Sequence, residues 1–226
     1  MRIAFKTLLV LTSVFLVYMC YRSIMNPIEF DREKAVRDKA VIAKLIDIRK
    51  AQIAYKDAKG VYTDNFDTLL HFIKEDSVMM ISKKGELTDE QLEKGLTEEI
   101  AVALTEENAA QYGIEDYYNF KENFRRDTSY VSVLVNLYGE GYNVDSLAYV
   151  PYLNNVKFEM ETGDNKTKSG IVIPLFEART PYKTYLEGMD RQEIINLTKQ
   201  AIALGKYEGL KVGDKVNPNN NAGNWE

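Results

Sequence analysis

The chain has 226 residues, of which 45% are hydrophobic and 28% are charged, and its formal net charge at pH 7 is −5. The first 28 residues hold three basic and no acidic side chains, so the remainder carries 26 basic and 34 acidic side chains, an excess of acid that argues against nucleic acid as a partner. A single cysteine and a single histidine exclude a disulfide framework and metal sites built from several histidines.

The first predicted element is an apolar membrane anchor over residues 1–28. Residues 7–21 carry no charge, and the flanking Lys6 and Arg22 can extend their side chains from the ends of this run to the bilayer surface. The stretch over residues 3–25 is long enough to cross a bilayer as one helix. We therefore expect a single-pass anchor, with the lipid bilayer as a partner.

The location of the rest of the chain is predicted from the short basic N-terminus, which is typical of an uncleaved signal anchor. It places the anchor in the inner (cytoplasmic) membrane with an extracytoplasmic or periplasmic head. The basic residues that follow the span favour the opposite orientation, although acidic residues are interleaved with them. Two alternatives stay open: cleavage as an ordinary signal peptide, although no A-x-A-like site follows the run, and lipoprotein processing at Cys20, although no small residue precedes it.

A long amphipathic helix is predicted directly after the anchor, up to Lys59, and a short helix follows it, so that residues 29–75 form a second segment. Gly60 provides the C-terminal cap of the first helix, and Asp64 or Asn65 provides the N-terminal cap of the second. The apolar face of the long helix is expected to pack on the protein's own sheet, leaving its alanine-rich face for partners. That apolar face comprises Val41, Ile42, Leu45, Ile46, Ile48, Ile53 and Tyr55.

Residues 76–226 are predicted to form one α+β head. Its first expected elements are a strand over residues 78–81, helices capped by Thr88 and Thr105, and an antiparallel meander of four strands over residues 128–178. A helix after Asp190 that ends at Gly205 and a strand over residues 210–212 are expected to follow. The apolar set of this helix comprises Ile194, Ile195, Leu197, Ile202 and Leu204. Helices precede strands in blocks, without βαβ alternation. The predicted fold class is therefore α+β, with the long N-terminal helix packed on an antiparallel sheet.

Residues 6–73 resemble the type IV pilins and the type II secretion pseudopilins. The resemblance is carried by the apolar helix, Pro27, the alanine-rich helix and the passage AQIAYKDAKGVYT, in which Gln52, Tyr55, Gly60, Val61 and Tyr62, with Leu69 beyond it, match the family pattern. It implies a pilin-like fold, a kink at Pro27, and packing of the N-terminal helix against copies of itself or related membrane-anchored subunits. Two departures, Val10 in place of the usual buried glutamate and the lack of a glycine before Lys6, imply an unprocessed relative.

Candidate chemistry is confined to two sets of oxygen-bearing side chains. Asp214, Asn217, Asn219 and Asn220 offer the hard ligands that calcium takes, and the alternative is a flexible polar terminus. The carboxylates Glu98, Glu99, Glu106, Glu107, Glu115 and Asp116 could hydrolyse a glycan, although such runs are usually solvated helix faces. His71 is interpreted as a structural imidazole. We predict no catalytic residue and no cofactor other than calcium.

The sequence thus favours a non-enzymatic, membrane-anchored structural or assembly component of a cell-envelope secretion or pilus-like system. The alternative is a membrane-tethered extracytoplasmic binding module whose tyrosine-rich strands recognise a glycan, a peptide or an envelope protein. A tethered hydrolase is a third hypothesis.

Overall fold

The computed structural model describes residues 2–226, apart from the side chains of residues 2–4, 80, 81 and 128. Met1, where the predicted anchor begins, lies outside the described residues. Two compact units are formed. The anchored unit comprises the chain up to Ile73 together with Gly141–Glu226, and the inserted unit comprises Lys74–Glu140. The α+β class is confirmed. The sequence pattern predicts one head over residues 76–226 and does not separate the inserted unit from it.

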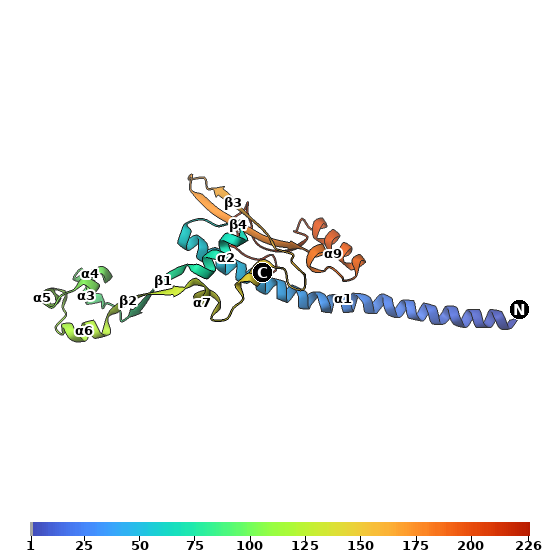
Figure 1. Ribbon diagram of the computed structural model, residues 1–226, viewed down its shortest axis with the longest axis horizontal. Coiled ribbons are helices and arrows are strands. Elements are labelled where there is room, and N and C mark those ends of the chain that lie inside the picture. Colours follow the sequence, from blue (N-terminus) through green and yellow to red (C-terminus); the bar gives the residue numbers. More distant parts are fainter. Residues whose placement is uncertain (1) are drawn as a thin grey trace. The chain divides into compact units, whose positions relative to one another are not determined.

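The dominant element is helix α1, Arg2–Lys59, which continues through Pro27 (Figure 1). It ends where predicted, because Gly60 adopts a φ of +83° and donates its N–H to the carbonyl of Lys56 at 2.7 Å. Helix α2, Phe66–Glu75, follows after a short turn. Its predicted cap is also confirmed, since the side-chain oxygen of Asn65 accepts the backbone N–H of Asp67 at 2.7 Å.

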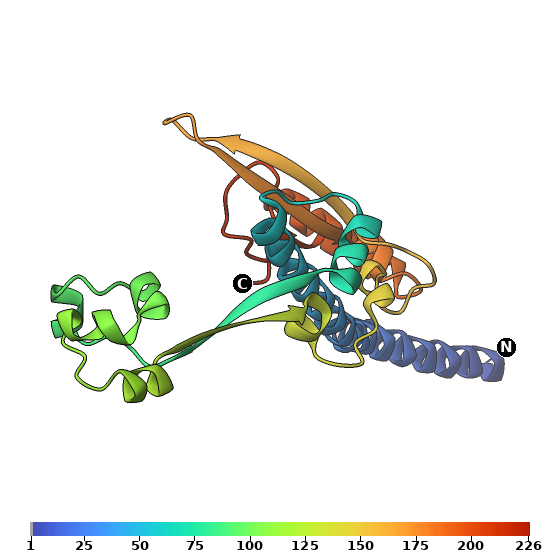
Figure 2. The same cartoon turned by 60° about the vertical axis from the view of Figure 1, so that its left-hand side comes forward.

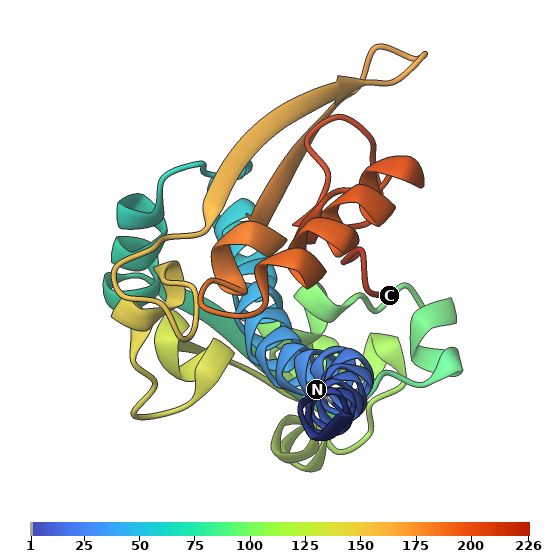
Figure 3. The same ribbon diagram turned by 90° about the vertical axis from the view of Figure 1, so that its right-hand side faces the viewer.

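The anchored unit has a three-stranded antiparallel sheet of β3 (Glu159–Lys166), β4 (Val172–Pro181) and β5 (Gly209–Gly213), with β4 in the centre. Helix α1 contacts β4 and β5. In the view nearly along α1, the β3–β4 hairpin and helix α9 lie to one side of it (Figure 3). Short helices α8 (Tyr182–Tyr185) and η2 (Val144–Ala148) and helix α9 (Arg191–Ala203) complete this unit.

The core of the anchored unit lies between α1 and the inner face of the sheet. Side chains four or three residues apart on α1 are fully buried there, as are alternate residues of β4 and β5; they are Val41, Leu45 and Ile48, facing Phe176, Ala178 and Val212. The buried stripe on α1 continues through Ala51 and Gln52, whereas Ile53 of the predicted face is 39% exposed. The predicted packing of α1 on the sheet is therefore confirmed, with its face rotated by part of a turn.

The inserted unit is a two-stranded antiparallel ribbon that carries a group of short helices (Figure 2). Strands β1 (Ser77–Lys84) and β2 (Arg125–Ser132) form the ribbon. Between them lie α3 (Asp89–Glu93), α4 (Glu98–Ala103), α5 (Glu106–Ala109), η1 (Ala110–Tyr112) and α6 (Tyr117–Asn123), and α7 (Val133–Tyr138) follows β2. These helices have their own core, formed by Leu96, Ala101, Leu104, Ala109, Ile114 and Phe124.

The predicted four-stranded meander over residues 128–178 is wrong. Its first segment ends as a strand at Ser132 and continues as helix α7, and its second segment forms the helix η2. Only its last two segments pair with each other, as β3 and β4. Short apolar runs such as VLVNLY have no periodicity that separates a strand from a buried helical turn, so the long-range pairing decides between them.

Several local signals elsewhere are confirmed, and two are not. Thr88 and Gln91 form a reciprocal capping box at α3, and Asp190 caps α9 through the backbone N–H groups of Gln192 and Glu193. Thr105 precedes α5 without a side-chain capping hydrogen bond. The strand predicted over residues 210–212 is β5. Of the predicted apolar set, Ile202 on α9 and Leu204 directly after it are exposed, and Ala201 is the buried residue of α9.

Candidate functional site

The N-terminal half of α1 is a continuous exposed apolar surface of the anchored unit. Every described side chain from Phe5 to Ile24 is exposed, including those of Leu9, Val14 and Val17. Among the described residues, α1 is the one helix long and apolar enough to cross a membrane, and none of its apolar window is buried against protein. A helix packed inside a soluble protein would bury one face, so this half of α1 is a candidate single-pass anchor.

The exposure of α1 changes within one and a half turns. Met25, Asn26 and Pro27 are partly covered, and Phe30 is only 6% exposed. The covering segment is the loop between α8 and α9, because this loop and the start of the covered part of α1 together enclose a cavity of about 400 Å³. The residues that line this basal cavity are Arg22, Asn26, Glu29, Phe30, Glu33, Gly188, Met189 and Asp190.

Arg37 fastens the α8–α9 loop to α1. Its guanidinium donates to the carbonyl oxygens of Tyr185 and Glu187 at 3.1 and 2.8 Å and pairs with Glu33 one turn earlier at 2.8 Å. The Tyr185 hydroxyl donates to Asp38 at 2.6 Å, and burial together with this hydrogen bond raises the pKa of Tyr185. Tyr185 and Leu186 are also fully buried, so the start of the loop is packed against the rest of the unit.

Above the basal cavity, one face of α1 stays uncovered. It bears the exposed side chains of Val36, Lys39, Ala43 and Lys50, and the predicted partner position Ala54 is partly buried. Small and apolar residues between cations permit close approach of a second helix. The adjacent side of α1 is occupied by protein, since Lys44 donates to the hydroxyl of Ser146 in η2 at 2.8 Å.

The predicted calcium ligands lie in the turn after β5, where most of them have protein partners. One carboxylate oxygen of Asp214 accepts the backbone N–H groups of Val216 and Asn217 at 2.8 and 2.9 Å, and the other accepts the Lys211 ammonium at 3.1 Å. Asn219 donates its amide to the Ala222 carbonyl at 3.2 Å. Asn220, with a φ of +55°, serves the turn through its backbone. Calcium binding here stays a prediction, and the turn has an internal structural role.

The tail beyond this turn contacts α1 and the turn that follows α1. Arg49 pairs with Glu226 at 2.7 Å, and Asn221 donates to the Tyr62 hydroxyl at 3.0 Å. The ring of Trp225 lies against Gly223, where an added Cβ would meet it at 2.4 Å.

Asp214 predicts a pH effect on stability. Although burial opposes it, the hydrogen bonds from Asn217, Val216 and Lys211 lower the pKa of Asp214. A carboxyl group with a lower pKa in the folded state stabilises the fold above its unfolded pKa, near 3.9, and loses this effect as the pH falls through the folded pKa. Asp214→Asn should therefore reduce the free energy of unfolding at pH 7 by about 0.5–1 kcal/mol. The difference from wild type should shrink as the pH falls below about 4 and vanish below the lowered pKa of the folded state.

Denaturant titration of the full chain in detergent at several pH values measures this. Asp64→Asn, at an exposed position of the same unit, is the control and should change stability little at any pH. A pH-independent loss in Asp214→Asn would contradict the electrostatic origin.

The outer face of the sheet carries a network of ion pairs. Arg179 contacts Glu159, Glu161 and Glu177 at 2.9, 2.5 and 2.6 Å. Lys211 contacts Glu177 at 2.9 Å, and Lys215 contacts Glu161. Because Glu177 is buried and both its oxygens are paired, this network ties the three strands together instead of presenting a carboxylate to a ligand.

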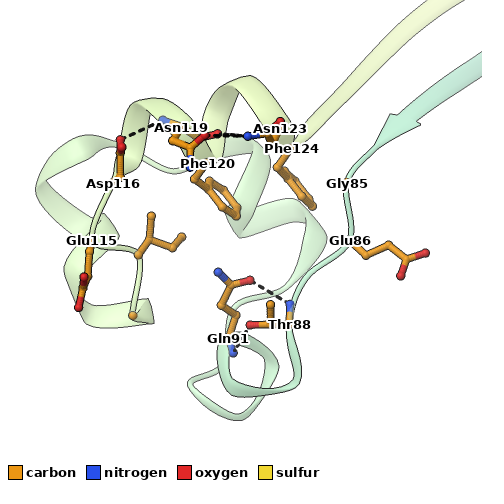
Figure 4. Close-up of a pocket in the computed structure, with 12 residues that line it drawn as sticks. Gly85, Glu86, Thr88, Gln91, Glu115, Asp116, Asn119, Phe120, Asn123 and Phe124 are labelled. Atoms are coloured by element: carbon orange, nitrogen blue, oxygen red, sulfur yellow. Dashed lines mark hydrogen bonds between the residues drawn. The ribbon is translucent and has the colours of Figure 1, made fainter.

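The inserted unit holds a second cavity, of about 340 Å³ (Figure 4). Its apolar side is formed by Ile114, Phe120 and Phe124, the two phenyl rings being stacked at 5.1 Å between centroids. Its polar rim includes Glu86, Gln91, Glu115, Asp116, Asn119 and Asn123. Several of these serve the fold, since Asp116 caps α6 and Asn123 donates to Asn119 at 2.8 Å. Aromatic floor and amide rim together suit a small polar ligand.

Two of the carboxylates considered for hydrolysis have structural partners. Glu98 binds Lys83 and Arg126 at 3.0 and 3.3 Å, and these hydrogen bonds lower its pKa, opposite to the shift that a general acid needs. Glu106 accepts the Tyr118 hydroxyl at 3.0 Å. His71 is exposed on α2. Within the described residues, no group of three or more His, Cys, Asp or Glu side chains is arranged to hold a metal ion.

Sequence reasoning missed the basal cavity. Its two sides are separated by about 160 residues, and the loop residues Gly188, Met189 and Asp190 carry no motif. The one available signal was the spacing of Arg22, Asn26, Glu29 and Glu33, which places these polar residues on one face of a helix directly above an apolar span.

No family model matches the chain, and no curated protein or solved structure matches it significantly.

Proposed function

We propose that the protein is a non-enzymatic structural or assembly component of a cell-envelope secretion or pilus-like system, anchored by residues 5–25 of α1 in the inner membrane with its folded units outside the cytoplasm. The observation that carries this proposal is the division of α1 into an exposed apolar half and a half packed on an antiparallel sheet. A pilin-like protein would have this arrangement, and the AQIAYKDAKGVYT passage supports the same family.

The proposed contact with other subunits is the uncovered face of α1 around Ala43. In such an assembly this face packs against α1 of a second copy or of a related anchored subunit, because its small residues allow close approach. Val10 in place of the usual glutamate removes a charge that would guide insertion into a regular filament. We therefore favour a minor or non-polymerising component.

Cross-linking in native membranes tests this proposal. In a Cys20→Ala background, Ala43→Cys labelled with a photoreactive benzophenone should yield adducts with the same protein or with other single-pass membrane subunits, identified by mass spectrometry. Ser169→Cys, in the exposed turn between β3 and β4, is the control and should yield adducts at least several-fold less often. A strictly monomeric protein without adducts at position 43 would overturn the assembly proposal.

A second candidate is a tethered binding module, favoured by one observation: the inserted unit has its own core and its own cavity with an aromatic floor. In this case a glycan or peptide would bind there. Experiments in the same membranes distinguish the two proposals. A binding module would give no adducts at position 43 of α1, and it would lose its ligand in Phe120→Ala but not in Ala43→Cys.

A further inference from the structure

We propose that the basal cavity binds the headgroup of an aminophospholipid of the phosphatidylethanolamine class. This inference rests on the membrane anchor proposed above and adds a specific lipid ligand to it. The cavity combines residues of α1 with the α8–α9 loop of the same unit.

The basal cavity lies at the height of the lipid headgroups when α1 spans a bilayer. The apolar stretch from Phe5 to Ile24 is about 30 Å long at 1.5 Å per residue, which matches the hydrocarbon thickness. Arg22 is in the last turn of this stretch, where its side chain reaches the lipid phosphates. Glu29 follows about 10 Å higher along the helix axis, and Phe30 is already covered by protein. The base of the anchored unit therefore rests on the membrane surface.

The polar residues of the cavity are ordered along the membrane normal. Arg22, Asn26, Glu29 and Glu33 recur at helical spacing on one face of α1, so the cation is nearest the bilayer and the carboxylates are further out. Phosphatidylethanolamine has the complementary order, because its phosphate lies nearest the acyl chains and its ammonium group follows. A guanidinium binds a phosphate with paired hydrogen bonds, and a carboxylate accepts those of an ammonium.

Glu29 is the carboxylate we assign to the ammonium group. Among the described contacts, Glu33 is paired with Arg37, and the Asp190 side chain accepts two backbone N–H groups at the start of α9. Glu29 is exposed and lines the cavity between them and Arg22. The amide of Asn26, one turn above Arg22, can donate to a phosphate oxygen.

The same charges discriminate against the other common headgroups. Phosphatidylglycerol has no cationic group, so the lipid would bring no counter-charge to Glu29 beside its phosphate. Phosphatidylcholine has a cationic group without N–H donors, which leaves Glu29 without a hydrogen-bond donor from the lipid. The site is also preformed, since the bonds from Arg37 hold the α8–α9 loop against α1 and little ordering is required on binding.

The test uses the full-length protein in nanodiscs made from equal parts of phosphatidylethanolamine, phosphatidylglycerol and phosphatidylcholine, followed by native mass spectrometry of the lipids retained on the released protein. We expect retained phosphatidylethanolamine to outnumber each of the other two lipids by about tenfold, as a charge-assisted hydrogen bond implies. Glu29→Gln and Arg22→Gln should each abolish this enrichment. Asp31→Asn and Arg32→Gln remove matched charges from other faces of α1 and should preserve it.

Insertion is measured separately, by co-purification of protein and nanodisc. Inserted wild-type protein without enrichment, enrichment of phosphatidylglycerol instead, or equal loss of enrichment in the control variants would each overturn the lipid site while leaving the anchor intact. Wild-type protein that does not insert would overturn both the site and the anchor. Neither result depends on the cross-links at position 43, so the assembly proposal succeeds or fails independently.

Discussion

Val14→Arg is expected to shift the protein from the membrane fraction to the soluble fraction. Val14 lies midway between Lys6 and Arg22 and is 63% exposed. An arginine at the centre of a spanning helix costs about 2.5–3.5 kcal/mol of insertion free energy, equivalent to about 100-fold in the partition between membrane and water. The fraction that resists alkaline carbonate extraction should therefore fall sharply.

Val36→Arg is the matched control for this experiment. Val36 is 56% exposed on the same helix but lies beyond the proposed span, so its replacement should leave the protein in the membrane. Equal retention of both variants in the carbonate pellet would contradict the assignment of the N-terminal half of α1 as the anchor, and would require another explanation for its exposed apolar surface.

The second large effect is expected for Gln52→Leu. Gln52 is fully buried, and its side chain binds both backbone groups of Thr63: its amide donates to the carbonyl at 2.6 Å, and its oxygen accepts the N–H at 3.2 Å. The amide also donates to the Met160 sulfur of β3 at 2.9 Å. Gln52 thus joins the end of α1 to the turn before α2 and to the sheet.

Leucine has nearly the same volume but leaves two buried backbone groups without partners, each at a cost of about 1–3 kcal/mol. We expect the free energy of unfolding of the anchored unit to fall by about 2–4 kcal/mol and its Tm by about 5–15 °C. Denaturation of the full chain in detergent, followed by the fluorescence of Trp225 in the same unit, measures this. Gln192→Leu, on the exposed side of α9, should change the free energy by less than about 0.5 kcal/mol, and an equal loss in both variants would contradict the role of Gln52.

Gln52 also illustrates the limit of pattern reasoning. The passage that contains Gln52 matches a family pattern. The apolar residues around Gln52 nevertheless predict that Ile53, and not Gln52, lies on the face packed against the sheet. In the structure Ala51 and Gln52 face the sheet and Ile53 is exposed. Hydrophobic periodicity alone does not fix which way a helix is rotated about its axis to within part of a turn. A polar residue such as Gln52 makes its face look exposed in the pattern, although the residue is buried once its hydrogen-bond partners are in place.

The sequence by itself determined the features that depend on neighbours within about one turn or on long uniform stretches. These are the α+β class, the apolar half of α1, the helix ends at Gly60, Asn65 and Asp190, the capping box at Thr88, and the short strand β5. Each rests on a cap, a glycine or an unbroken apolar run, whose free energy is local.

Only the tertiary structure decided the rest. Whether residues 133–138 extend a strand or form a helix, which residues make up the inserted unit, and how Glu29 meets a loop about 160 residues away all depend on contacts distant in sequence. Such contacts require loops to close against chain entropy, and the balance is decided by the packing of whole elements, so no local pattern encodes them. The basal cavity, the ligand site we propose, belongs to this second class.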